Sequence, residues 1–141
     1  MRYHWHAMVH EFGVRLGEAR RLDPSFKDYQ CLCVIDVKGL SPSHLNKKTL
    51  AIIKSQAAVD SLCFPETMNR TLVLNAPVYF STFWKIVRTF LDKRTAGKIE
   101  IFANKKKGHA RLRELVAADQ LPSDYGGSAA PTTDQVRMGI M

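Results

Sequence analysis

The sequence predicts an α/β fold with a mostly parallel sheet and helices around it. Helical and strand-like apolar patterns alternate along the chain, and the run at residues 31–37 is apolar almost throughout. The 141 residues suit one domain, and 45% hydrophobic content is enough to form one core. Alternating helices and strands favour parallel strands joined by right-handed crossovers.

The first half of the chain predicts a helix, a strand and a second helix. Apolar residues recur every three or four positions over residues 2–21, until an Asp-Pro pair ends the pattern. The apolar run at residues 31–37 predicts a strand that is covered on both faces. A Ser-Pro pair at residues 41–42 supplies an N-cap and a first helical proline, and the helix should end just before Pro65. The apolar stripe of the first helix comprises Trp5, Met8, Phe12, Leu16 and Ala19.

The second half continues the same alternation. From residue 126 onward Gly, Ser, Ala, Pro and Thr dominate, a composition typical of a flexible tail. We therefore expect a domain over residues 1–127 and a tail over residues 128–141. The remaining elements are predicted at residues 71–74 (strand), 76–91 (helix), 99–102 (strand) and 109–116 (helix).

The formal charge of +8 is concentrated in one part of the chain. From Lys85 to Arg113 there are ten basic residues against Asp92 and Glu100, whereas eleven basic and eleven acidic residues balance elsewhere. Such a cluster implies a phosphate-bearing partner, which charge alone does not identify as a membrane or a nucleic acid. The run at Lys105, Lys106 and Lys107 fits a solvated loop, a membrane-docking patch or a nucleic-acid contact.

The predicted helix at residues 76–91 is unusually apolar. Its hydrophobic side chains cover more of the circumference than one stripe, and the polar ridge is narrow. Such a helix is either sandwiched in a core or faces lipid for part of its working cycle. Both interpretations remain open from the residues alone. The polar ridge comprises Ser81, Lys85, Arg88 and Asp92.

Targeting and redox features favour a cytoplasmic protein. The chain has no run of about 18 apolar residues and no N-terminal apolar run followed by a cleavage-like site. Cysteines number three, and Cys31 and Cys33 lie too close together in one strand for an ordinary bridge. We expect a soluble protein with reduced thiols.

Motifs for enzymes and metal sites are absent from the sequence. The chain carries no G-x-x-x-x-G-K-[ST], G-x-G-x-x-G, G-x-S-x-G or H-E-x-x-H motif, so we expect no enzyme, no cofactor and no metal. His6 and His10 are spaced as metal ligands could be, although a solvated helical face explains them as well. The aromatic residues gather at residues 76–91 instead of interleaving with Lys and Arg, which argues against nucleic acid.

Six collinear motifs carry a family resemblance. They are V-I-D-V-K-G-L at residues 34–40, F-P-E at 64–66, L-N-A-P at 74–77, F-S-T-F-W-K-I-V-R-T-F-L-D at 80–92, T-A-G-K-I at 95–99 and L-P-S-D-Y-G-G at 121–127. In this order the chain resembles the CRAL-TRIO lipid-binding domain. It is most similar to the secretory-pathway phosphatidylinositol/phosphatidylcholine transfer proteins, over residues 8–127.

The resemblance implies a sheet that floors an apolar pocket, a mobile gate helix at residues 76–91, and no catalytic chemistry. Cys31 and Cys33 are then expected to line the pocket, on one side of their strand. The resemblance further implies a cytoplasmic protein that associates peripherally with membranes. It would exchange a phospholipid, expected from the family to be phosphatidylinositol, between membranes or present it at one of them. The gate residues expected are Phe80, Phe83, Trp84, Val87 and Phe90.

Three residues match the head-group positions of the inositol-lipid binders. Glu66 and Lys98 correspond to the glutamate and lysine that hold the inositol phosphate, and Thr95 falls on a further position. A lysine suits a phosphodiester, while a carboxylate accepts hydrogen bonds from inositol hydroxyls. The alternative is that Glu66 and Lys98 only pair with each other. Alternative functions are a lipid-sensing module without transfer, or a binder of tocopherol, retinoid or sterol-like ligands.

The chain also departs from the family pattern. Phosphatidylcholine binders carry hydroxyl side chains at the positions of Cys31 and Cys33, and tend to have arginine at that of Thr67, so choline-lipid binding is not implied. Family members normally have a helical N-terminal domain and opening strands before the helix at residues 2–21. Their absence predicts a truncated, C-terminal portion of the fold with an open sheet edge.

Overall fold

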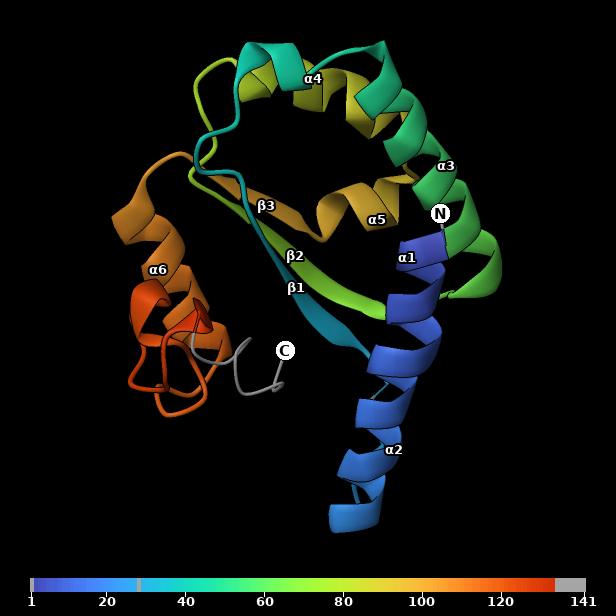
Figure 1. Ribbon diagram of the computed structural model, residues 1–141, viewed down its shortest axis with the longest axis vertical. Helices are drawn as coiled ribbons and strands as arrows, with labels where there is room; N and C mark the ends of the chain where they lie inside the picture. The colour runs from blue at the N-terminus through green and yellow to red at the C-terminus, as the bar shows by residue number, and fades with distance from the viewer. Residues whose placement is uncertain (1, 28, 134–141) are drawn as a thin grey trace.

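The computed structural model describes residues 2–27 and 29–133, which form a three-stranded parallel sheet with helices on both faces (Figure 1). The strands are β1 (Cys31–Asp36), β2 (Met68–Leu74) and β3 (Ile99–Phe102), in the order β1-β2-β3. Both strand pairs are parallel. The predicted α/β class with a parallel sheet is confirmed.

Helices α3 (Lys47–Cys63) and α4 (Phe80–Val87) lie on one side of the sheet. Val73 of β2 points to this side and packs with Phe80, Phe83 and Val87 of α4. Partly buried residues of α3 and β3 complete the contact. We call the buried group the α4 cluster. It comprises Val73, Ala76, Phe80, Phe83 and Val87.

Helix α6 (Lys105–Leu115) covers the opposite side of the sheet. Leu72 and Leu74 of β2 point to it and are 0% and 2% exposed, as side chains alternate along a strand. With Leu112 and Leu121 they form the α6 cluster. Two buried clusters, one on each face, therefore enclose β2.

The N-terminal helix extends past the sheet (Figure 1). It runs continuously through α1 (Arg2–His6), the π-helical η1 (Ala7–Phe12) and α2 (Gly13–Leu22). Its first turns meet the end of α3, where the rings of Trp5 and Phe64 lie 5.3 Å apart between centroids. No residue of α2 is buried. The predicted helix is present, but its apolar stripe is only partly covered.

Strand β1 is less buried than its apolar sequence predicts. Val34 and Ile35 are 40% and 46% exposed, so the expectation of a strand covered on both faces is wrong for β1. The reason is strand order: β1 pairs only with β2 among the described residues and lies at the sheet edge. The central strand β2 is instead the strand that is covered on both faces.

Helix boundaries differ from the predicted ones where side chains cap backbone groups. The Ser-Pro pair at residues 41–42 opens only a short 3-10 turn, η2 (Pro42–His44), and α3 begins later because the Asn46 side chain accepts from the amides of Lys48 and Thr49. Helix α6 begins four residues earlier than predicted, because Asn104 caps it.

The predicted helix at residues 76–91 is shorter in the structure. A turn precedes it, in which the Phe80 amide donates to the Pro77 carbonyl at 2.9 Å. The 3-10 turn η3 (Arg88–Phe90) follows α4, and a short helix α5 (Lys93–Gly97), which the sequence did not predict, leads into β3. The Asp92 side chain caps α5 by accepting from the Thr95 amide.

The C-terminal segment folds back onto the loop after α6. The 3-10 turn η4 (Ser123–Tyr125) is followed by a bridge between Pro122 and Ala129, and the Ser128 amide donates to the Ala118 carbonyl at 2.7 Å. Residues 128–132, which we expected to begin a flexible tail, are therefore hydrogen-bonded to the domain. Residues 134–141 lie outside the described residues.

Candidate functional site

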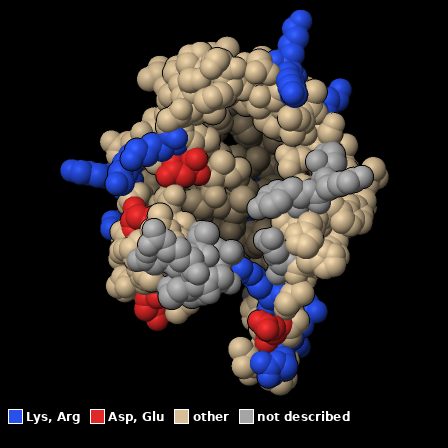
Figure 2. Space-filling model, in the orientation of Figure 1, with Lys and Arg blue, Asp and Glu red and all other residues tan. Residues whose placement is uncertain are grey.

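The face of the molecule shown in Figure 2 is hollowed between the sheet and the arch of α3 and α4. Leu32 packs against the α6 cluster, so the alternating residues Cys31, Cys33 and Ile35 point to the hollow side of β1. Cys33 and Ile35 are exposed there, and the surface inside the hollow carries few charged groups (Figure 2). The floor of the hollow is therefore apolar and partly uncovered.

Both predicted pocket cysteines lie on this floor as free thiols. The protein around them removes part of their contact with water, and this partial desolvation raises the pKa of both the Cys31 and the Cys33 thiol. They therefore stay protonated and uncharged at neutral pH. In the described part of the chain, no group of three or more metal-ligating side chains comes together. His6 and His10 are therefore not part of such a group among these residues.

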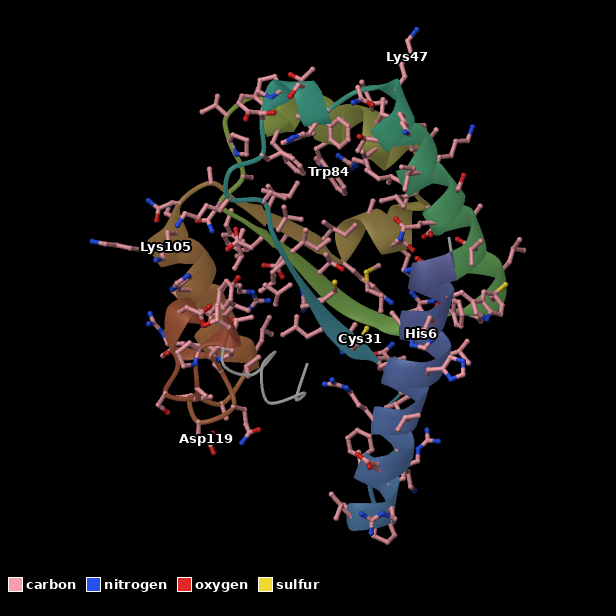
Figure 3. All side chains as sticks on the ribbon, in the orientation of Figure 1. His6, Cys31, Lys47, Trp84, Lys105 and Asp119 are labelled. Carbon is pink, nitrogen blue, oxygen red and sulfur yellow. The ribbon has the colours of Figure 1, made fainter. Side chains whose placement is uncertain are left out.

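The predicted gate residues lie along the inward side of α4 and η3. Phe80, Phe83 and Val87 are buried in the α4 cluster, and Trp84 packs against it while extending toward the interior (Figure 3). Phe90 is half-buried, with the Lys54 ammonium 5.7 Å from its ring centroid. The spacing of three, four and seven residues explains why one helical side carries them.

The outward side of residues 78–88, which comprise the turn before α4, the helix itself and the start of η3, is also apolar. Val78 is 90% exposed, and Tyr79 and Ile86 are exposed as well. Lys85 and Arg88 are exposed alongside them. Because α4 is buried on one side only, it is not sandwiched between two layers, and its apolar outer residues face solvent.

Glu66 and Lys98, far apart in the sequence, meet at the amino-terminal ends of β2 and β3. Lys98 Nζ lies 3.4 Å from Glu66 Oε2 and donates to the Met68 carbonyl at 2.8 Å. The side chain of Lys98 is 23% exposed and that of Glu66 is 40% exposed. This region is therefore a polar, half-open rim.

The backbone of Glu66 adopts an unusual conformation. Its φ is +60°, in the left-handed region that residues other than glycine seldom occupy. Gln30, the residue before β1, donates from its side chain to the Glu66 carbonyl at 3.0 Å. This hydrogen bond stabilises the turn at Glu66. The turn directs the carboxylate toward α5.

Thr95, the third predicted head-group residue, lies in α5 one turn before Lys98. It is half-buried, and its amide donates to Asp92 Oδ1 at 2.9 Å. Thr95 therefore lies on the short helix that leads to Lys98, whereas Glu66 comes from the turn between α3 and β2.

Sequence reasoning missed Arg94. Its Nη1 lies 2.8 Å from Glu66 Oε1, closer than Lys98 lies to the other carboxylate oxygen. The available signal was the spacing of Arg94 and Lys98, four residues apart, which places two cations on one side of a helical turn. We call Glu66, Arg94 and Lys98 the rim cluster.

The lysines at residues 105–107 begin α6 and are exposed. They lie at the same end of the sheet as the start of α4, because the Ala76 amide after β2 donates to the Phe102 carbonyl of β3 at 3.0 Å. Lys105 extends away from the molecule (Figure 3). This end of the sheet is opposite the rim cluster.

Hydrogen bonds to the Asp36 side chain join the C-terminal segment to the end of β1. Asp36 accepts from the Asn75 side chain at 2.8 Å, from the Lys38 amide at 2.8 Å and from the Tyr125 hydroxyl at 3.1 Å. Partial burial opposes the charge of Asp36, but these hydrogen bonds outweigh it and lower its pKa. Burial and the neighbouring Asp36 charge raise the pKa of Tyr125 to about 12.

An apolar hollow over a parallel sheet, roofed by an apolar helix and bordered by a charged rim, defines an α/β binding domain. Residues 3–127 match the CRAL/TRIO domain model, so the chain belongs to the CRAL/TRIO domain family. The family resemblance of the sequence motifs is thereby confirmed.

Curated relatives include two phosphatidylinositol/phosphatidylcholine transfer proteins of Arabidopsis thaliana. SFH12 is 34% identical over 99 residues and SFH4 is 35% identical over 95 residues, which are 70% and 67% of this chain. Protein real-time of Anopheles gambiae is 34% identical over 100 residues, 70% of the chain. The matched stretches span only 18%, 15% and 14% of these relatives, respectively.

Proposed function

We propose that this domain binds a phospholipid and that the protein exchanges or presents phosphatidylinositol between membranes, without catalysis. The acyl chains would occupy the hollow under α4, and the head group would lie at the rim cluster. One observation carries the proposal: the fold brings Glu66 and Lys98, which are 32 residues apart in the sequence, to within 3.4 Å of each other. The names of the Arabidopsis relatives support the choice of lipid class.

The energetics indicate which part of the lipid decides selectivity. Burial of each methylene stabilises by about 0.8 kcal/mol, but a membrane offers the acyl chains nearly the same gain. The transfer of the tails is therefore close to neutral. Hydrogen bonds to charged groups, each contributing about 1.5 to 3 kcal/mol, then discriminate between head groups.

The outer side of α4 supports transient contact with the cytoplasmic surface of a membrane. Val78 and Ile86 offer exposed apolar side chains, and Lys85 and Arg88 lie beside them. Each lysine or arginine near an anionic leaflet contributes about 1 kcal/mol. Lys105, Lys106 and Lys107 lie at the same end of the sheet and would add to this attraction. None of the helices in the described ranges has both the length and the hydropathy to cross a bilayer.

Extraction of lipid from the purified protein, followed by mass spectrometry and a vesicle transfer assay, tests the proposal. Recovery of phosphatidylinositol together with its movement from donor to acceptor vesicles is the expected result. Binding without movement would favour a lipid-sensing module, and recovery of a tocopherol, retinoid or sterol would indicate another ligand. A folded sample that yields no lipid and transfers none would overturn the proposal.

A further inference from the structure

The two head-group residues matched by the family pattern carry no net charge together. Glu66 and Lys98 form a carboxylate–ammonium pair with Nζ and Oε2 3.4 Å apart. At the distance of a bound ligand, the attraction of the lysine for a phosphodiester is offset by the repulsion of the carboxylate. The pair alone can therefore orient a head group, but it provides little net attraction for an anionic head group.

Arg94 changes this balance. Its guanidinium Nη1 lies 2.8 Å from Glu66 Oε1, the carboxylate oxygen that Lys98 does not approach. Each cation thus contacts a different oxygen of the same carboxylate. With Arg94 included, the rim cluster carries one net positive charge, which matches the single negative charge of a phosphodiester.

The surroundings of Lys98 leave room for this role. An ammonium group has three N–H donors. Within the described ranges, one donates to the Met68 carbonyl at 2.8 Å and a second to Glu66. The third donor can therefore serve a ligand while the other two hold the group in place.

We propose that Arg94 is a specificity-determining residue that acts through Glu66, and this inference rests on the proposed function. Arg94 neutralises and orients the carboxylate, so that Lys98 is available to the phosphodiester and Glu66 still presents lone pairs to the hydroxyls of the head group. The role is one of positioning, because Arg94 contacts the Glu66 carboxylate while its own side chain is 74% exposed.

A double-mutant cycle with binding to phosphatidylinositol-containing vesicles tests the inference. Arg94→Gln should weaken binding about two- to fivefold, the range expected for an exposed ion pair. Its effect should shrink in a Glu66→Gln background, because the carboxylate through which it acts is gone. Arg94→Lys should restore part of the affinity, since the charge returns without the planar fork.

Lys93→Gln is the matched control, since it removes the same charge from the neighbouring exposed position of α5. If Arg94 acted only through the overall field, Lys93→Gln would match Arg94→Gln, and Arg94→Gln would cost the same in both backgrounds. Either result would overturn the inference while the proposed function stands. Failure of the wild-type protein to bind these vesicles would overturn both.

Discussion

Lys98 reaches from the end of α5 to the first residue of β2, where the 2.8 Å bond to the Met68 carbonyl fixes its ammonium group. A main-chain acceptor in a strand moves little, so this bond holds the lysine in place when a ligand enters. Glu66 is likewise held by its turn, through the Gln30 side chain. Both head-group candidates are thus positioned by the backbone and not only by each other.

Lys98→Ala and, separately, Glu66→Ala are expected to abolish phosphatidylinositol transfer while leaving the melting temperature nearly unchanged. A partly exposed ion pair contributes only about 0 to 1 kcal/mol to stability, whereas the head group loses its charged partner. Vesicle transfer assays and thermal melts measure the two effects. Wild-type transfer by either variant would refute the assignment.

Tyr125 is expected to make the protein sensitive to alkaline pH. Its pKa rises from 10.0 to about 12 on folding, so the protonated phenol is favoured in the folded state. The associated stabilisation is complete below pH 10 and is lost as pH rises toward about 12. Unfolding free energies of the wild type and Tyr125→Phe, measured across this window, should converge as pH rises. A constant difference would contradict the prediction.

At the scale of elements, α6 packs unusually close to the sheet at Gly108. A Cβ at this position would lie 2.7 Å from Leu74 Cδ2 and 3.3 Å from Phe102 Cβ. Leu74 is 2% exposed and has little room to move. The glycine therefore permits the contact between helix and sheet that forms the α6 cluster.

Gly108→Ala is expected to destabilise the protein, although alanine is the better helix former. The gain in helix propensity is about 1 kcal/mol, and the overpacking cost is about 1 to 3 kcal/mol, so the cost should prevail. Gly17→Ala in α2 is the matched control, since its Cβ would meet nothing within 4 Å and the propensity gain should appear alone. Chemical denaturation measures both variants. If Gly108→Ala and Gly17→Ala stabilised the protein equally, the Leu74 side chain would have to move aside at no cost.

Helix α4 combines two apolar sides with different exposure. Replacing Val78 and Ile86 together by Asp is expected to weaken binding to anionic vesicles, because it removes apolar contact and adds negative charge. Leu62→Asp is the control, an 82% exposed residue near the end of α3. Vesicle co-sedimentation measures the effect. If Leu62→Asp reduced binding as much, the outer side of α4 would not be the contact surface.

For the whole molecule, the proposed binding of lipid in the hollow predicts an effect on stability. A ligand that binds only the folded state stabilises it in proportion to the logarithm of its concentration over its dissociation constant. We expect the lipid-loaded protein to melt at a higher temperature than the same protein after solvent extraction. Reloading with phosphatidylinositol should reverse the loss, as measured by differential scanning calorimetry. Identical melting of both forms would indicate that nothing fills the hollow.

The elements that local patterns predict well are those with strong signals of their own. The strand at residues 99–102 was predicted with its observed bounds, and the helix at residues 2–21 differs by one residue at its end. Helix α5 was missed because five residues are too few to show a period. The side chains of Asn46 and Asn104 cap α3 and α6 and thereby determine where these helices begin. Apolar periodicity does not reveal such capping residues.

The sequence by itself determined the α/β class, the parallel sheet and the family, because periodicity and collinear motifs are properties of the chain. It also selected Glu66 and Lys98 as a pair. Only the tertiary structure decided that β1 is an exposed edge, that α4 is buried on one side, and that Arg94 joins the rim cluster. Burial and ion pairing depend on which distant segments become neighbours, and a linear pattern does not specify those neighbours.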